Sequence, residues 1–238
     1  CLVTGEWTKI GRLHPSIKGI KGAQPTGATL VGFNAPAYES YNRGQGWNAP
    51  TGERAIFAYG TALNYLLSRE SDTPKINIGD TTVVYWAESA NPIYVDVFST
   101  LFDPEWVNTE PTLRRDRQAS QRLRDLADKV RSGAPLDADR MLEGIDRDTR
   151  FYVLGLAPNA ARVAVRFFHR DPFHKIIRRI LAHYDDMAIQ REFENQPARI
   201  PLRVILDETV SKNASDKTPS PLMAGAVMRA VLNDTPYP

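Results

Sequence analysis

Hydrophobic residues recur along several segments of the chain at the spacing of one helical face. After Pro50, which can begin a helix, small or apolar residues follow at positions i, i+4, i+7 and i+11: Ile56, Gly60, Leu63 and Leu67. Residues spaced in this way line one side of an α-helix, so this segment is predicted to bury that side. Comparable patterns predict further helices over 92–102, 109–131, 172–187, 202–210 and 222–232.

Other segments have the density of β-branched and aromatic residues that is typical of strands. The run TTVVYW at 81–86 predicts a central strand, and a short strand is predicted at 28–33. Segments 150–156 and 161–168 are predicted to form two strands joined by the turn GLAPNA, because proline and asparagine favour a hairpin loop. Alternation along the second strand points one set of side chains inward, Val163, Val165 and Phe167, and the other outward, Arg162, Ala164 and Arg166.

Two of the predicted helices have features that matter for function. Asp171 is expected to cap the 172–187 helix, with Pro172 in its first position. The 109–131 helix combines an apolar stripe with a basic flank. The stripe is formed by Ala119, Leu123, Leu126 and Val130, and the flank by Arg115, Arg122 and Lys129.

Helices that do not alternate strictly with strands, together with a hairpin, predict an α+β fold. We expect a mixed, mostly antiparallel sheet, several packed helices and a Gly-rich N-terminal loop region, since eight of the fifteen glycines lie in the first 46 residues. Two regions are predicted, 1–110 and 111–238, which can also form one continuous domain.

The composition is that of an ordinary soluble domain, with 42% hydrophobic and 24% charged residues in 238. Cys1 is the only cysteine, which excludes an intrachain disulfide and a Cys-rich zinc site and favours a reducing cytoplasm. No apolar stretch is long enough to span a membrane, and the start CLVTGEWTKIG is unlike a signal peptide. Because the first residue is not Met, we expect an excised interior piece or a processed product.

Charge is strongly segregated along the chain despite a formal net charge of +2. The blocks 1–54, 55–110, 111–180 and 181–238 have net charges of +3, -6, +7 and -2. Basic faces opposed by an acidic one suit a polyanionic partner, and solvated arginine-rich helices are the alternative.

Residues that often perform catalysis occur here without the spacing that catalysis requires. His174 and His183 are nine positions apart, which places them on opposite sides of a helix, and neither His14 nor His169 completes a metal-binding motif. His14 is instead expected to form a hydrogen bond in a loop. The sequence contains no P-loop, dinucleotide-binding glycine motif or nucleophile elbow. It therefore predicts no catalytic residue, metal or cofactor.

The stretch 14–50 has the residue types of a nucleic-acid contact. Lys18 and Lys21 each precede a glycine, so a phosphate chain could approach the backbone closely. Amides and aromatic residues then interleave: Asn34, Tyr38, Tyr41, Asn42, Gln45, Trp47 and Asn48. Amides can read base edges and aromatic rings can stack on bases. The alternative is a connector whose amides satisfy its own turns and whose aromatic residues belong to the core.

Seven strings occur in collinear order over most of the chain: CLVTGE, HPSIKGIKGAQ, FNAPAYESYNRGQGWNAP, FAYGTALNYLL, IGDTTVVYWAE, FYVLGLAPNAARVAVRFF and LMAGAVMRAVLNDTPYP. Together they resemble the large subunit of the type I-C CRISPR surveillance complex (Cascade). The resemblance implies an interior fragment, since that family has sequence on both sides, and one that lacks the C-terminal helical region similar to a small subunit.

The resemblance also implies a non-catalytic role in antiviral defence. The family's large subunit contacts the PAM duplex of target double-stranded DNA, helps unwinding begin and recruits a helicase-nuclease effector. Guide pairing reads the target in such complexes, and protein side chains read the adjacent motif. The partners implied are target double-stranded DNA, the crRNA-bearing backbone subunits and the helicase-nuclease effector, with no membrane.

Candidate contact residues fall into two groups. In the Gly-rich stretch, Gln45 and Asn48 are assigned to base-edge or groove contacts. The residues assigned to phosphate contacts are Lys18, Lys21 and Arg43, and Gln24 is a further candidate. A second basic group could guide a displaced strand or hold neighbouring subunits: Arg115, Arg122, Lys129, Arg162 and Arg166. Its alternative is a solvated face paired with the acidic blocks. Two other classes stay open for the whole chain, a recruitment platform without DNA contact and a metal-dependent nuclease.

Overall fold

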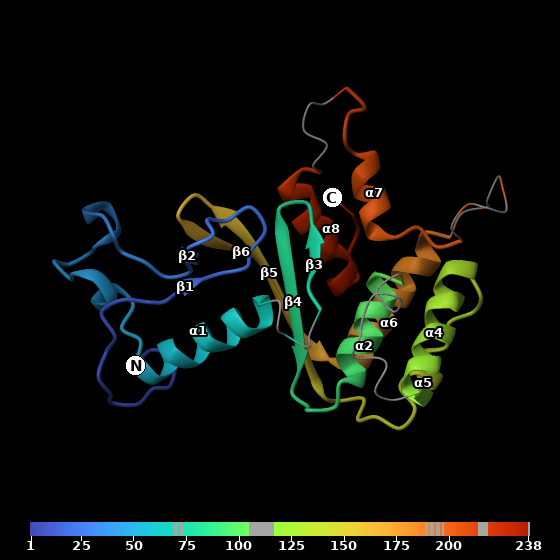
Figure 1. The fold of residues 1–238 in the computed structure, drawn as a ribbon, viewed down its shortest axis with the longest axis horizontal. Helices are drawn as coiled ribbons and strands as arrows, with labels where there is room; N and C mark the ends of the chain where they lie inside the picture. The colour runs from blue at the N-terminus through green and yellow to red at the C-terminus, as the bar shows by residue number, and fades with distance from the viewer. Residues whose placement is uncertain are drawn as a thin grey trace. The chain divides into compact units, whose positions relative to one another are not determined.

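The computed structural model describes residues 1–68, 71, 74–104, 117–188, 190, 193, 196, 198–213 and 219–237. This part of the chain has seven α-helices and a six-stranded mixed sheet in the order β1-β2-β6-β5-β4-β3 (Figure 1), which confirms the α+β prediction. The strands are β1 Ser16–Ile17, β2 Ala28–Thr29, β3 Ile76–Ile78, β4 Thr81–Ala87, β5 Arg150–Asn159 and β6 Arg162–Pro172. The helices are α1 Glu53–Leu67, α2 Ile93–Phe102, α4 Arg117–Ser132, α5 Ala138–Met141, α6 Phe173–Asp186, α7 Leu202–Glu208 and α8 Pro221–Asn233, with short 3-10 turns η1 Pro36–Tyr38 and η2 Gln45–Asn48.

The chain forms two compact units that interleave along the sequence. Unit 1 comprises Cys1–Ser71, Lys75–Val84 and Gly155–Arg166, and unit 2 comprises the remaining residues. The division into 1–110 and 111–238 stays a prediction.

Unit 1 is built around α1 and the β1–β2 pair. The helix begins at Glu53 and buries Ile56, Gly60, Leu63 and Leu67, the four positions that periodicity predicted. It packs against β1, where Ile17 is completely buried. The antiparallel β1–β2 pair joins β6 through a parallel contact of Thr29 with Arg162. The predicted 28–33 strand is therefore shorter than expected, and residues 30–33 form bends and irregular structure.

Unit 2 has an aromatic core between its strands and helices. Phe98 of α2 lies 4.6 Å from Tyr85 of β4 and 5.0 Å from Phe151 of β5, measured between ring centroids. Phe151 in turn lies 5.1 Å from Phe173, the first residue of α6. The hydroxyl groups of Tyr85 and Ser99 are 2.8 Å apart inside this core, so the buried Tyr85 phenol is paired within the packing. Helices α2 and α6 contact each other (Figure 1).

The start of α6 differs from the prediction. Pro172 is the N-cap residue, it belongs to β6, and no side chain caps the helix. The Asp171 carboxylate instead accepts a 2.6 Å hydrogen bond from Arg179, which also donates to the Leu232 carbonyl oxygen at the end of α8. The carboxylate thus joins β6 to α6, because a guanidinium is a stronger partner than the first backbone N–H groups of the helix.

The hairpin also differs from the prediction. Strand β5 continues through the predicted turn to Asn159, and the connection is two residues, Ala160 and Ala161. Leu156 and Ala157 are fully buried, so burial extends the strand despite the proline that follows them. Ala160 has a φ of 52°, as a tight two-residue turn requires.

Side-chain directions along β6 match the prediction in part. Val163 and Phe167 are buried as expected, but Val165 is 50% exposed. Of the 109–131 helix, the structure describes α4 from Arg117, and its buried residues include Leu123, Leu126 and Val130. The earlier part of that prediction lies outside the described residues. The short helix α5 has no counterpart among the sequence predictions.

None of the helices in the described ranges has the length and apolar character needed to span a membrane.

Candidate nucleic-acid interface

The segment 34–48, here called the front loop, has an unusual backbone. It contains η1 and η2 and three non-glycine residues with left-handed φ angles, Tyr41 at 53°, Asn42 at 55° and Gln45 at 53°. Asparagine adopts this conformation readily, but tyrosine and glutamine do so at a cost. Such conformations persist where surrounding contacts hold them, and they cluster at binding sites.

Two side chains hold the front loop from within. The Asn48 amide oxygen accepts a 2.8 Å hydrogen bond from the Ser40 N–H, and its NH2 group donates to the carbonyl oxygens of Arg43 and Gln45 at 2.5 and 2.9 Å. The Glu39 carboxylate accepts a 3.0 Å hydrogen bond from the Gln45 N–H. The strained residue Gln45 is thus fixed from both sides.

The front loop is also fixed to the backbone of Gly11 and Arg12. The Gly46 N–H donates to the Arg12 carbonyl oxygen at 3.1 Å. Gly46 is buried, and a Cβ at this position would lie 2.3 Å from the Gly11 oxygen and 2.8 Å from the Arg12 oxygen. Only glycine permits this approach of two backbones, so the loop is mounted directly on its neighbour.

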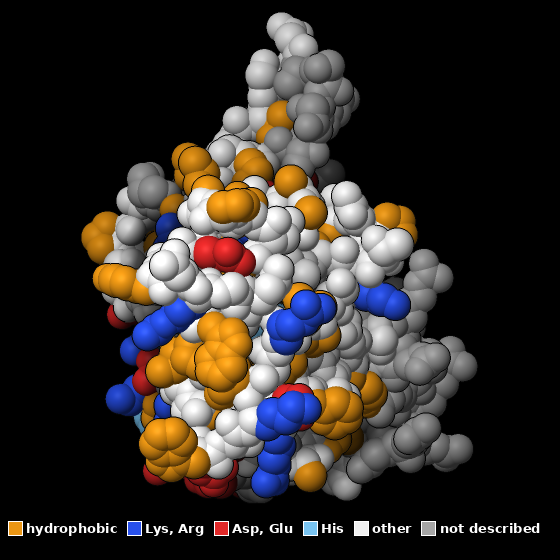
Figure 2. All heavy atoms as spheres, turned by 90° about the vertical axis from the view of Figure 1, so that its left-hand side faces the viewer, with side chains coloured by type: hydrophobic (Ala, Val, Ile, Leu, Met, Phe, Trp, Pro, Cys, Tyr) orange, Lys and Arg blue, Asp and Glu red, His pale blue; other side chains and the backbone are white. Residues whose placement is uncertain are grey.

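The outer surface of the front loop displays aromatic and basic groups. Tyr41 is 92% exposed and Trp47 58% exposed. The Arg162 guanidinium of β6 lies 3.9 Å from the centre of the Tyr38 ring and donates a 2.7 Å hydrogen bond to Asn34. Figure 2 views the side of Figure 1 on which this loop lies and shows hydrophobic and basic side chains interspersed there.

The structure assigns different positions to the sequence-predicted residues of the loop. Arg43 is exposed, and Gln45 is half-buried with its hydrogen bonds made by backbone atoms. Asn48 was predicted to read bases, but both its donors and its acceptor are used inside the loop. These bonds hold the segment that contains Arg43 and Trp47, and a base contact of Asn48 stays a prediction.

Lys18, Lys21 and Gln24 lie elsewhere in unit 1. They belong to the connection between antiparallel β1 and β2, whereas the front loop follows the other end of β2. The Lys18 N–H donates to the Asn64 side chain of α1 at 2.8 Å, and the Lys21 ammonium donates to the Gly79 carbonyl oxygen at 3.2 Å. Lys18 and Gln24 are exposed. The predicted set is thus divided between two ends of one strand pair.

The second predicted basic group is not one surface either. Arg166 forms a 3.1 Å ion pair with Asp80, and both side chains are about three-quarters buried at 26% and 21% exposure. Arg166 thus has an acidic partner, as the alternative predicted, whereas Arg162 contacts Tyr38 and Asn34 of the front loop. Arg122 and Lys129 are exposed on α4 in unit 2, and Arg115 lies outside the described residues.

A groove of about 800 Å³ runs between α1 and residues 11–15 in unit 1. Leu13, Phe57 and Tyr65 line it and are 59%, 72% and 50% exposed. His14 and the Tyr59 hydroxyl are 2.7 Å apart beside it, which confirms the hydrogen-bonding role expected of this histidine. Burial lowers the pKa of His14 and raises that of Tyr59. Such an apolar groove suits a protein partner better than a phosphate chain.

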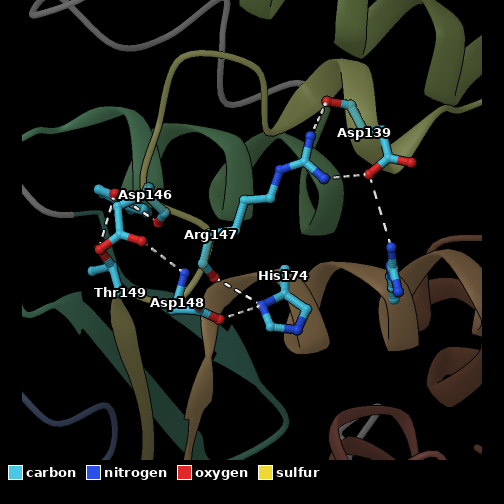
Figure 3. A network of polar contacts seen from close by, with 8 residues as sticks. Asp139, Asp146, Arg147, Asp148, Thr149 and His174 are labelled. Carbon is cyan, nitrogen blue, oxygen red and sulfur yellow. Dashed lines mark hydrogen bonds and ion pairs between the residues drawn. The ribbon is translucent and has the colours of Figure 1, made fainter.

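Unit 2 contains a polar network that could be taken for a catalytic cluster (Figure 3). Arg147 donates a 2.6 Å hydrogen bond to Asp139, and His174 lies 3.4 Å from Asp148. The Asp146 carboxylate accepts hydrogen bonds from the Asp148 backbone N–H and the Thr149 hydroxyl in the turn before β5. Each carboxylate in the network has an arginine, histidine or backbone partner, so the network stabilises the turn. Within the described ranges, no group of three or more His, Cys, Asp or Glu side chains could hold a metal ion.

The contact of Arg162 with Tyr38 and Asn34 was not predicted, although each residue had been noted separately. Arg162 and Asn34 are 128 positions apart, and the parallel β2–β6 pairing that unites them has no local sequence signal. An outward-facing arginine on a strand beside an aromatic loop is a signal only once the strand order is known.

The whole chain was compared with known proteins in two ways. The family model described as CRISPR-associated protein (Cas_Csd1) matches residues 1–238. A search of curated proteins gives no match to the chain.

Proposed function

The chain belongs to the Cas_Csd1 family of CRISPR-associated proteins, and we propose that it is a non-catalytic large subunit of a type I-C RNA-guided surveillance complex. In this proposal the front loop contacts the PAM duplex of target DNA. The chain then supports unwinding and recruits a helicase-nuclease effector. Backbone subunits that hold the crRNA are its neighbours, and guide pairing reads the rest of the target.

The observation that supports this function best is the set of contacts that fix an exposed aromatic and basic loop. Asn48, Glu39 and Gly46 hold three left-handed residues in place. A surface that is ordered before binding loses little conformational entropy when it meets a partner. Exposed Tyr41 and Trp47 next to Arg43 would be costly in a loop that had no partner.

Each side chain of the loop has a role in the proposed contact. Arg43 neutralises a phosphate, and Gln45 reaches a base edge in the groove. Trp47 and Tyr41 pack on sugars or bases at the point where the duplex opens, as aromatic wedges do in other DNA-bending proteins. Lys18 and Lys21, at the far end of the β1–β2 pair, contact phosphates further along the duplex.

A binding assay on the assembled complex tests this assignment. Gln45→Ala is expected to weaken binding of a PAM-containing duplex by about 1–3 kcal/mol and to reduce discrimination against a changed PAM. Arg43→Gln is expected to weaken binding to both sequences equally and to lower the salt dependence by about one phosphate contact. The measurement is the dissociation constant at several salt concentrations for matched and altered duplexes.

Asn42→Gly is a matched control, because Asn42 is an exposed amide of the same loop and glycine accepts its left-handed backbone. It is expected to leave sequence discrimination unchanged. Discrimination that survives Gln45→Ala, together with a salt dependence that survives Arg43→Gln, would exclude the front loop as the reading surface.

A recruitment platform without DNA contact is the second candidate function, and the groove along α1 favours it. Phe57 and Tyr65 are exposed on the helix beside Leu13. If the platform function is the correct one, Phe57→Ala will reduce effector recruitment while every front-loop variant leaves DNA affinity intact.

A further inference from the structure

Three aromatic side chains from three neighbouring strands form a stack in unit 2. Trp86 of β4 and Tyr152 of β5 have ring centroids 5.1 Å apart and an interplanar angle of 7°. Phe168 of β6 continues the row, 6.1 Å from Tyr152 at 27°. These separations are close to the distance between adjacent strands, so the rings stack in the direction that crosses the sheet.

The stack lies on the face of these strands that faces away from the aromatic core. The residues immediately before the three rings, Tyr85, Phe151 and Phe167, are all buried. Because neighbouring residues of a strand point to opposite faces, the three stacked rings share the other face. The core helices α2 and α6 cover the first face, through Phe98 and Phe173.

One end of the stack is open. Phe168 is 57% exposed, and within the described residues no further ring lies against it. β2 pairs with β6 at Arg162, six positions before Phe168. The outer face of the Phe168 ring can therefore receive another flat group.

Two arginines accompany the stack. Arg170 is two residues beyond Phe168 on β6, and its guanidinium lies 5.8 Å from the centre of the Tyr152 ring. Arg150 is two residues before Tyr152 on β5 and is exposed. The Glu88 carboxylate accepts a hydrogen bond from the Tyr152 hydroxyl, which holds this ring upright. The two guanidinium groups and one engaged carboxylate leave the surface with an excess positive charge.

We propose that this surface, here called the sheet platform and comprising Trp86, Tyr152, Phe168, Arg150 and Arg170, binds single-stranded DNA. A base stacks on the open face of Phe168 and continues the row, while the arginines contact the flanking phosphates. Flat rings beside guanidinium groups suit single strands, because every base has a face to stack and a duplex leaves few faces free. The choice of DNA rests on the proposed function, since opening a target duplex supplies a DNA strand.

The experiment uses the assembled complex and a single-stranded DNA that does not pair with the guide. The oligonucleotide contains 2-aminopurine for fluorescence titration and, in a second preparation, 5-iodouracil for photocrosslinking. We expect crosslinked peptides from 150–154 or 166–170, and Phe168→Ala is expected to weaken binding about tenfold. Arg170→Gln is expected to lower the salt dependence by about one phosphate contact. Phe193→Ala, a change of the same size at a 59% exposed site in unit 2, is the matched control and should have no effect.

Several outcomes would overturn the proposal. These are unchanged affinity in Phe168→Ala, crosslinks confined to other segments, equal or tighter binding of an RNA of the same sequence, or protection of Phe168 by another subunit. The same variants are also titrated with PAM duplex, where Phe168→Ala should bind normally. Failure of the sheet platform is thereby distinguished from failure of the front loop.

Discussion

At Gly46 the front loop lies directly against the backbone of Gly11 and Arg12. Glycine is required at this position, because the backbone oxygens of Gly11 and Arg12 leave no space for a Cβ. Backbone atoms cannot move aside as the end of a flexible side chain can. The effect of substitution here should consequently be large.

Gly46→Ala is expected to destabilise the fold by about 2–3 kcal/mol, because the added methyl group must displace backbone. Gly44→Ala is the control within the same loop, since the nearest atom to its Cβ is the Glu39 carboxylate oxygen at 4.0 Å. Its effect should stay within about 0.5 kcal/mol. Urea unfolding of the two variants measures the difference, and equal stabilities would show that the close contact is not present in solution.

Asn48 illustrates what single residues reveal in a sequence. Its amide among glycines and aromatic residues predicted a contact with bases, but amides serve their own turns by the same chemistry. The direction of the side chain, toward Ser40, depends on the left-handed residues between them. Sequence inspection has no access to those angles.

At the scale of elements, Arg179 links β6, α6 and the end of α8. Its guanidinium is 25% exposed and donates to Asp171 and to the Leu232 carbonyl oxygen. Burial alone would raise the pKa of Asp171, but hydrogen bonding and the charge of Arg179 lower it below its ordinary value. The neighbouring Arg178 is 62% exposed and lies 3.8 Å from Asp139.

Arg179→Met is expected to cost about 1–3 kcal/mol, because a partly buried carboxylate and a helix-end carbonyl group lose their donor. Arg178→Met should change stability by less than about 1 kcal/mol, as for an exposed ion pair. Thermal unfolding of both variants provides the comparison. Should the two substitutions have equal effects, the link between α6 and α8 would contribute nothing to stability.

Elements with a local signal were predictable from the sequence. The four buried positions of α1 followed from periodicity, and β4 followed from its run of β-branched and aromatic residues. Errors arose where tertiary contacts compete with local preferences. The proline and asparagine after Ala157 suggested a turn, yet burial extends β5 past them, and Asp171 suggested a cap, yet it pairs with Arg179.

At the scale of the whole molecule, burial affects three histidines in the same way. The pKa values of His14, His169 and His183 are all lowered, with burial as the largest cause. In the unfolded chain these groups titrate near 6.5, so below that pH the unfolded state binds more protons. His14 also has a buried Nε2 atom without a hydrogen-bond partner in the described part of the chain.

The contribution of these histidines to the free energy of unfolding should therefore be constant above about pH 7 and fall as the pH drops below 6.5. Each histidine contributes at most about 1.4 kcal/mol per pH unit, until the pH passes below its folded-state pKa. Urea unfolding at pH 7.5, 6.5 and 5.5 measures this decline. His183→Gln should reduce it by one histidine's share, and stability that rises on acidification would contradict the assignment. Asp171 does not contribute in this range, because its carboxyl group protonates at lower pH.

The interleaving of the two units limits how they can be exchanged by recombination. Strands β4, β5 and β6 each begin in one unit and end in the other, at Val84, Leu154 and Arg166. No single cut in the polypeptide, and no single crossover between genes, can transfer either unit whole. If the proposed function is correct, a change of DNA preference arises through point substitutions in exposed segments or through exchange of a stretch that contains both units.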